Sequence, residues 1–239
     1  MNSSIEISPK SILTANFVLI LLLVIPHLIF GTKTYDSNTN GELARFFSLD
    51  WEENLPTLFS VISLLFGSIL SISISMIGEI KRKARLIWGS IGLILIALCI
   101  DDWLMLHERV DGDLKGFLET FSPIPLPGIG GSWEFFYALV LVIAVLLYSK
   151  FTLNLPRQIR NLIVTAFLMF AIGSVGLEIM VHDILDISAD PRDPLYFFFG
   201  TIEEMIELSS VAIFNYALLK YLLSYRSIAI RLSANEHIQ

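Results

Sequence analysis

Charged residues are scarce in this 239-residue chain: Asp, Glu, Lys and Arg make up 16% of it, whereas a soluble domain carries about 25%. Hydrophobic residues make up 54%, and the mean hydropathy is +0.70. So apolar a composition excludes an ordinary water-soluble fold. In lipid, only helices and closed barrels satisfy the backbone, and barrel strands alternate over segments of about 10 residues. The apolar runs here are longer and unbroken, which predicts an all-α, polytopic membrane protein.

Cysteine and histidine are also rare. The single cysteine, Cys99, lies in an apolar run, which excludes an intramolecular disulfide and favours a small packing residue. Four histidines are too few for membrane desaturases and hydroxylases, and the multiple-histidine pattern of ceramidase-like hydrolases is missing. No inverted repeat of the kind many transporters show is visible.

Six stretches are apolar enough to cross a membrane, which takes about 20 residues. They cover residues 12–30, 57–80, 86–106, 133–148, 162–181 and 197–222, and the fourth is short. The first stretch could be read as a signal peptide. However, Lys10 is the only base before it and no small-residue cleavage site follows, so we expect it to be retained. The sequence therefore predicts a single transmembrane domain over residues 1–239, built as a bundle of six helices.

Basic residues concentrate in four segments. Residues 1–11, 79–86, 150–160 and 220–239 hold 11 bases and 3 acids, while the rest of the chain holds 5 bases and 20 acids. Because bases in short loops stay on the cytoplasmic side, we expect both termini to be cytoplasmic and the acidic loops to face outside. We interpret the basic run 81–85 as topogenic, with a lipid or nucleic-acid patch as the alternative. The outer loop 109–132 can carry an interfacial helix over residues 112–121.

Acids and histidines gather where this topology places the outer ends of three spans, and ionisable residues in spans are costly. Asp101 and Glu108 share a face if the third helix stays regular. Glu178 and His182 are four residues apart in the fifth span, and Glu207 shares a face with the two glutamates before it in the sixth. The predicted ligands are Asp101, Glu108, Glu178, His182, Glu203 and Glu207, with Asp102, His107, Glu204 and Glu52 as weaker candidates.

Carboxylates this close do not all ionise without a cation. Acids with one or two imidazoles suit zinc, iron or manganese, and bridged metal pairs occur inside helical bundles. We therefore expect a divalent metal site, mononuclear or dinuclear. A proton or ion path, or interface polarity alone, are the alternatives. Thr201 and Glu204 can also form a capping box, and Glu203 can complement the helix dipole from a first turn.

The leading functional hypothesis is a metal-dependent hydrolase or oxidase acting on a lipid-type or lipid-linked substrate. The catalytic residues are unknown. A proton- or cation-coupled transporter or channel is one alternative, and a structural or assembly subunit of a membrane complex is another. The expected partners are membrane lipids, a lipid-linked substrate or a membrane protein, and we expect no nucleic acid.

Smaller features point to packing and helix starts. Pro56 suits the first turn of a helix, Asp50 with Glu53 can cap a short helix, and His27 after Pro26 predicts an interface histidine at a kink. A stripe of small residues in the second span predicts close helix packing: Ser60, Ser63, Gly67 and Ser71.

Three motifs carry a resemblance to known sequences. They are LDWEENLPTLFS at residues 49–60, DDWLMLHE at residues 101–108 and EEMIE at residues 203–207. On these motifs, the chain resembles a group of bacterial six-span membrane proteins with no established activity, which more commonly have Asp-Glu where this chain has Asp101-Asp102. The resemblance implies a bacterial inner (plasma) membrane and adds no activity or cofactor.

Overall fold

The computed structural model of the chain describes residues 4–5, 8–30, 41–106, 132–177, 179–181, 185, 187, 193–225 and 230–231. Its helices are α1 (Pro9–Phe30), α2 (Gly41–Phe47), α3 (Leu55–Ser75), α4 (Arg82–Leu104), α6 (Ser132–Leu153), α7 (Arg157–Ala171) and α8 (Pro194–Leu223). A π-helical segment, η2 (Ile172–Leu177), continues α7, and two short strands, β1 (Ser4–Ile5) and β2 (Ile230–Arg231), pair antiparallel. The all-helical prediction is confirmed for the described body of the chain.

Five of these helices are long and apolar enough to cross a membrane: α1, α3, α4, α7 with η2, and α8. Within α6, Ala138–Leu153 form a shorter apolar helical stretch. Large apolar side chains such as Leu22, Leu93 and Leu146 are exposed on the outside of the bundle. Since exposed apolar surface of this extent is unfavourable in water, the fold is that of a membrane protein.

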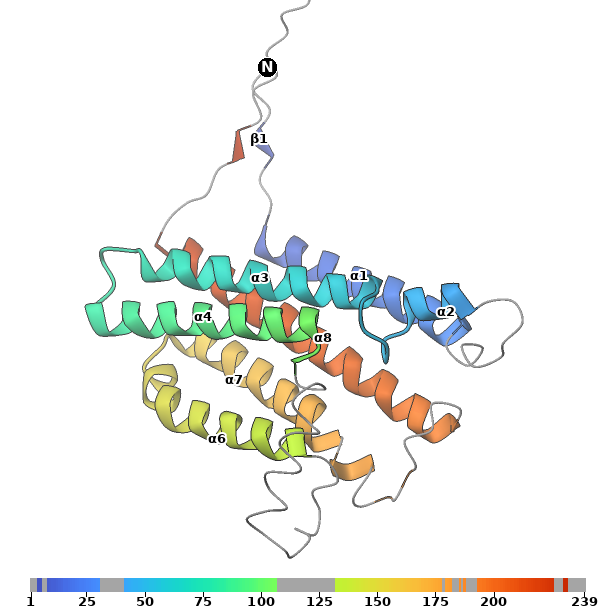
Figure 1. Cartoon of the computed structure of the whole chain (residues 1–239). Helices are drawn as coiled ribbons and strands as arrows, with labels where there is room; N and C mark the ends of the chain where they lie inside the picture. The colour runs from blue at the N-terminus through green and yellow to red at the C-terminus, as the bar shows by residue number, and fades with distance from the viewer. Residues whose placement is uncertain are drawn as a thin grey trace, which may run out of the picture.

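The long helices lie side by side, as Figure 1 shows. The connection over residues 76–81 joins α3 and α4 into an antiparallel pair. Helix α8 packs against α1, α3 and α7, and α6 packs against α7 and η2. Thus α8 is the central helix, and its buried side chains face several neighbouring helices.

Small residues let α3 and α4 approach closely. Ser68 Oγ donates to Gly92 O at 2.9 Å, and Ser71 Oγ donates to Trp88 O at 2.7 Å. A Cβ placed on Gly92 would lie 2.7 Å from Ile72 Cγ1, so only glycine fits this contact without a shift. The predicted small-residue packing of the second span is confirmed.

The core has two parts. One surrounds Trp88, whose ring lies edge-on to Phe151 at 5.2 Å and tilted against Tyr221 at 5.3 Å between centroids. The second joins α1, α8 and the segment after α2, and its buried members are Ile20, Val24, Leu49, Leu208 and Ala212. This second cluster lies in the half of the bundle that holds the acidic residues described below.

Two predicted boundaries were wrong in an informative way. Helix α3 ends at Ser75, not at residue 80, because the apolar Ile77 and Ile80 belong to the connection and are buried there. Helix α8 begins at Pro194, before residue 197, because Asp193 caps it by accepting from Leu195 N at 2.8 Å. The predicted interfacial helix over residues 112–121 lies outside the described residues.

Candidate carboxylate site

The segment between α2 and α3 is held in place by Asn54, the N-cap of α3. Its side-chain oxygen accepts from Thr57 N at 3.1 Å. Its amide nitrogen donates to the carbonyl oxygens of Arg45, Ser48 and Trp51 at 3.0, 2.7 and 2.6 Å. One side chain thus fixes the path of residues 48–54, which we call the acidic loop. Pro56 lies in the first turn of α3 as predicted, whereas the short helix that Asp50 and Glu53 were expected to cap does not form within residues 48–54.

His27 anchors the acidic loop from the side of α1. Its Nδ1 accepts from Leu49 N at 3.1 Å, so the ring proton lies on Nε2, which is 3.0 Å from Thr201 Oγ1 on α8. The ring also stacks on Phe197 with centroids 4.7 Å apart. The histidine is buried, and it joins α1, the acidic loop and α8. The prediction of an interface histidine is confirmed.

The three glutamates of α8 lie well inside the helix. Because α8 starts at Pro194, its first turn holds no acid. The capping box of Thr201 with Glu204 was therefore wrong, as was the dipole explanation for Glu203. Thr201 instead donates to Phe197 O at 2.7 Å. Neither local explanation accounts for the glutamates, so their placement is a matter of tertiary contacts.

The last turn of helix α4 carries two of the acidic residues that were predicted to be ligands. Asp101 and Asp102 are half-buried, and the helix ends at Leu104 with Met105 in the left-handed conformation (φ 51°). The argument that put Asp101 and Glu108 on one helical face was wrong, because it required the helix to continue through residue 108. A left-handed residue after the last turn is a common way for a helix to stop, and the sequence pattern did not reveal it.

Glu204 interacts electrostatically with acidic residues on three elements of the fold. The charges of Asp50 and Glu52 on the acidic loop, Asp102 on α4 and Glu207 on α8 all lie within electrostatic range of Glu204. Asp50 also lies 3.5 Å from Tyr196 Oη. Glu52 Oε2 and Asp102 Oδ2 are buried atoms. These five acids define the carboxylate cluster: Asp50, Glu52, Asp102, Glu204 and Glu207.

Glu207 lies against the π-helical segment. A Cβ on Gly173 would lie 2.9 Å from Glu207 Cγ and 3.4 Å from Glu203 O. Gly173 therefore lets η2 approach α8 at the level of the glutamates. Single π-helical turns are rare and occur often at functional sites, and this one immediately precedes Glu178. Glu203 and Asp101 are half-buried nearby on the same helices as the cluster members.

Four predicted ligands lie outside the described residues: His107, Glu108, Glu178 and His182. Among the residues that the structure describes, no three acidic, histidine or cysteine side chains are arranged closely enough to hold a metal ion. The described residues thus bring together Glu52, Asp102, Glu204 and Glu207 from the predicted set. They add Asp50, which the sequence predicts only as a helix cap because no local pattern links residue 50 with residue 204.

Chemically, the cluster is a set of carboxylate oxygens, which can act as metal ligands, at one end of a bundle whose exterior is apolar. Carboxylates gathered from separate elements attract cations or hold protons, because their mutual repulsion disfavours full ionisation. Oxygen donors alone suit magnesium, calcium or manganese, while an added imidazole shifts the preference toward zinc or iron. His182 would supply that imidazole if it joins the cluster.

The fold and this cluster define a helical integral membrane protein with an acidic site near one end of its helices. The chain belongs to a family described as a domain of unknown function, DUF8692, which matches residues 15–222. The match includes the whole cluster and all or most of each candidate spanning helix. No curated protein and no solved structure is similar to the chain.

Proposed function

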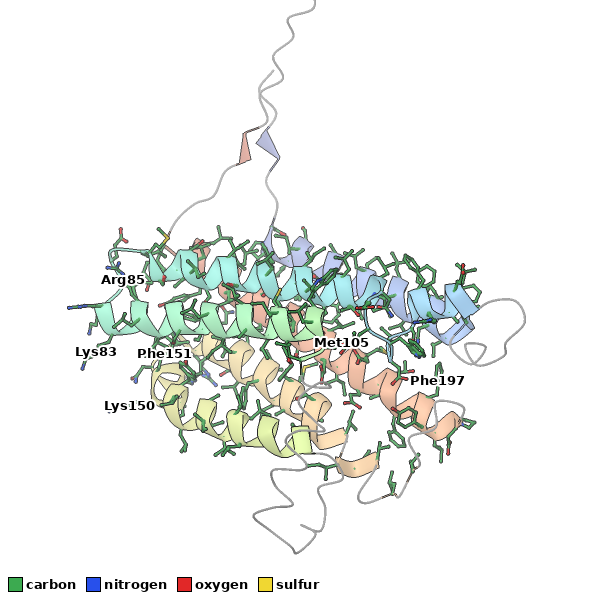
Figure 2. All side chains as sticks on the ribbon, viewed as in Figure 1. Lys83, Arg85, Met105, Lys150, Phe151 and Phe197 are labelled. Atoms are coloured by element: carbon green, nitrogen blue, oxygen red, sulfur yellow. The ribbon has the colours of Figure 1, made fainter. Side chains whose placement is uncertain are left out.

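We propose that the chain crosses the membrane six times, with α6 as the sixth span and both termini in the cytoplasm. Figure 2 labels Lys83, Arg85 and Lys150 at one end of the bundle and Phe197 at the other. The separation of bases from the carboxylate cluster supports this orientation, since bases in short loops remain cytoplasmic. The cluster then faces the outside, or the periplasm if the membrane is a bacterial inner membrane.

We further propose that the carboxylate cluster binds a divalent metal. The observation that carries this proposal is that acids on the acidic loop, α4 and α8 all lie within electrostatic range of Glu204. Glu178 and His182 follow η2, which Gly173 brings against Glu207, so they are the candidates to complete the site. A metal there can polarise a carbonyl or phosphoryl group or activate water. A hydrolase or oxidase acting on a lipid-type substrate fits a site at the membrane interface.

The test is the metal content of the full chain, purified in detergent from metal-replete cells. We expect stoichiometric metal in the wild type and its loss in Glu204→Gln and Glu207→Gln, which remove charge at nearly constant volume. Glu178→Gln tests the ligand that follows η2. The control is Glu79→Gln, an exposed acid in the connection between α3 and α4. Wild-type protein without metal, or equal loss in Glu79→Gln, would overturn the proposal.

A cation- or proton-coupled transporter is the second candidate, and Asn215 favours it. Asn215 lies 11 residues beyond Glu204, on the same face of α8 and about 16 Å along its axis. It is buried, and its Oδ1 has no hydrogen-bond partner among the described residues. However, the buried Leu208 and Ala212 lie between them on that face. This apolar interruption favours a closed site over a continuous path.

The two candidates differ in a measurement on liposomes. A transporter predicts a cation or proton flux through the reconstituted wild type that Asn215→Leu abolishes. The metal-site proposal predicts no such flux and unchanged metal content in Asn215→Leu.

A further inference from the structure

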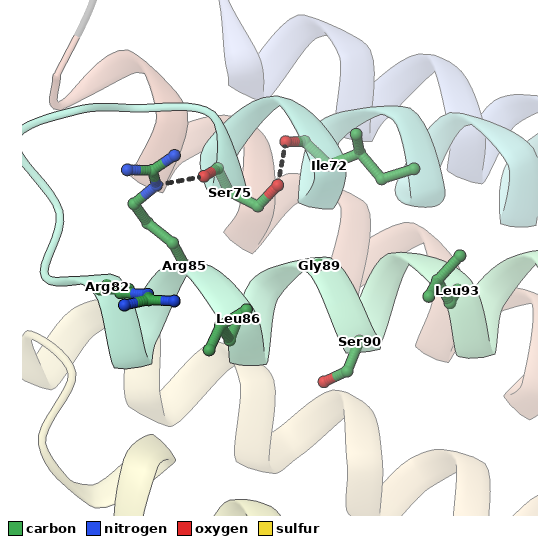
Figure 3. Close-up of a pocket in the computed structure, with 8 residues that line it drawn as sticks. All are labelled: Ile72, Ser75, Arg82, Arg85, Leu86, Gly89, Ser90 and Leu93. Carbon is green, nitrogen blue, oxygen red and sulfur yellow. Dashed lines mark hydrogen bonds between the residues drawn. The ribbon is translucent and has the colours of Figure 1, made fainter.

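A groove opens between the end of α3 and the start of α4, at the opposite end of these helices from the carboxylate cluster. It encloses about 510 Å³. Two bases, Arg82 and Arg85, line it together with the apolar side chains of Ile72, Leu86 and Leu93 and with Gly89 (Figure 3). The groove therefore combines cationic groups with an apolar surface.

One arginine is fixed by the backbone of the neighbouring helix. Arg85 Nε donates to Ser75 O at 2.8 Å, and Figure 3 shows the guanidinium reaching from α4 to the end of α3. Ser75 is the last residue of α3, where carbonyl groups lack partners within the helix. The bond uses Nε of Arg85 and orients its guanidinium group. Arg82, one turn earlier, adds a second exposed guanidinium.

The apolar part of the groove continues from the arginines toward the membrane centre. Arg82, Leu86, Gly89 and Leu93 follow one another at helical spacing, so they form a single stripe on α4. The stripe is about 16 Å long at 1.5 Å per residue, close to the depth of one leaflet. A Cβ on Gly89 would lie 3.8 Å from Ser75 Cβ, so the absence of a side chain at this residue leaves space in the groove.

We propose that this groove binds an anionic phospholipid. The phosphate group lies between Arg82 and Arg85, and an acyl chain lies along the stripe past Leu86 and Gly89. Charge complementarity selects the ligand, because guanidinium groups bind phosphate oxygens in a bidentate way, and basic pockets between spanning helices hold anionic headgroups. The site is independent of the carboxylate cluster, since Arg85 and Asp102 are about 25 Å apart along α4.

The chain offers a charge-matched control for this site. Lys81, at the end of the connection, and Lys83, in the first turn of α4, are exposed bases, but they do not line the groove. The double variant Arg82→Gln/Arg85→Gln and the double variant Lys81→Gln/Lys83→Gln therefore remove equal charge from the same segment. Only the first removes charge from the groove.

The experiment is native mass spectrometry of the delipidated full chain, titrated with phosphatidylglycerol or with phosphatidylcholine of equal chain length. We expect the wild type to retain phosphatidylglycerol preferentially. The arginine pair should weaken this binding roughly thirtyfold, or about fivefold for each base, and the lysine pair should leave it within about twofold. Equal binding of both lipids, or equal losses in the two double variants, would overturn the proposal.

Two further measurements separate a lipid from a free phosphate and guard against misfolding. Gly89→Leu keeps both arginines and fills the apolar floor, so it should weaken phosphatidylglycerol binding while leaving the elution volume on gel filtration unchanged. Inorganic phosphate at millimolar concentration should fail to displace the lipid. Complete displacement by inorganic phosphate, or full retention of the lipid by folded Gly89→Leu, would show that the apolar groove plays no part.

Discussion

His27 connects the stability of the fold with the carboxylate cluster, and replacing it should affect both. In His27→Phe the ring still stacks on Phe197, but Leu49 N loses its acceptor and Thr201 loses a partner. The acidic loop is then no longer anchored to α1. We expect a less stable protein in which Asp50 and Glu52 are no longer held against α8.

The size of the effect follows from the buried backbone donor. A buried N–H group without a partner costs about 1–3 kcal/mol, and Thr201 keeps its bond to Phe197 O. The stacking, worth about 0.5–1.5 kcal/mol, is retained in His27→Phe. The melting temperature should therefore fall by roughly 2–12 °C, at about 2–4 °C per kcal/mol for a chain of this size.

The assay is thermal unfolding in detergent, combined with the metal content of the same samples. His27→Asn is the matched control, because an Asn side-chain oxygen occupies nearly the position of Nδ1 and can accept from Leu49 N. His27→Gln mimics Nε2 instead and leaves Leu49 N without an acceptor. Metal retention in the order Asn above Gln and Phe supports the anchoring role. If all three variants hold metal equally well, the acidic loop does not depend on His27.

Three further predictions concern the bundle and its orientation. Gly92→Ala should lower stability by about 1–3 kcal/mol, because its Cβ would meet Ile72 Cγ1 at 2.7 Å; unchanged thermal unfolding would contradict the close α3–α4 contact. Asn54→Ala removes the cap of α3 and the bonds to the carbonyls of Arg45, Ser48 and Trp51, so it should cost about 1–2 kcal/mol and increase proteolysis of residues 48–54; protection equal to that of the wild type would refute the role of Asn54. Reporter fusions at both termini should show cytoplasmic activity, and an external terminus would refute the proposed orientation.

Part of the carboxylate cluster was within reach of sequence reasoning. Spacing along one helix places Glu204 and Glu207 on one side of α8, and the cost of acids in spans singled out Glu207. The same reasoning ranked Glu204 and Asp102 only as weaker candidates, behind Glu203 and Asp101. Asp50 was missed because its contact with α8 depends on the bonds of Asn54 and His27. Those bonds join residues far apart in the chain, and no local pattern encodes them.

The order and approximate extent of the apolar helices, the grouping of bases in four segments and the small-residue stripe all follow from the sequence. They depend on composition and short-range periodicity. These properties are decisive because lipid accepts only apolar helices whose backbone groups bond within the helix. Only the tertiary structure decided that α3 ends at Ser75, that α4 ends at Leu104 and that the acidic loop lies near Glu204. An apolar residue such as Ile77 is equally favourable in a helix or in a buried connection. Packing against neighbouring helices, rather than the residue itself, chooses between the two.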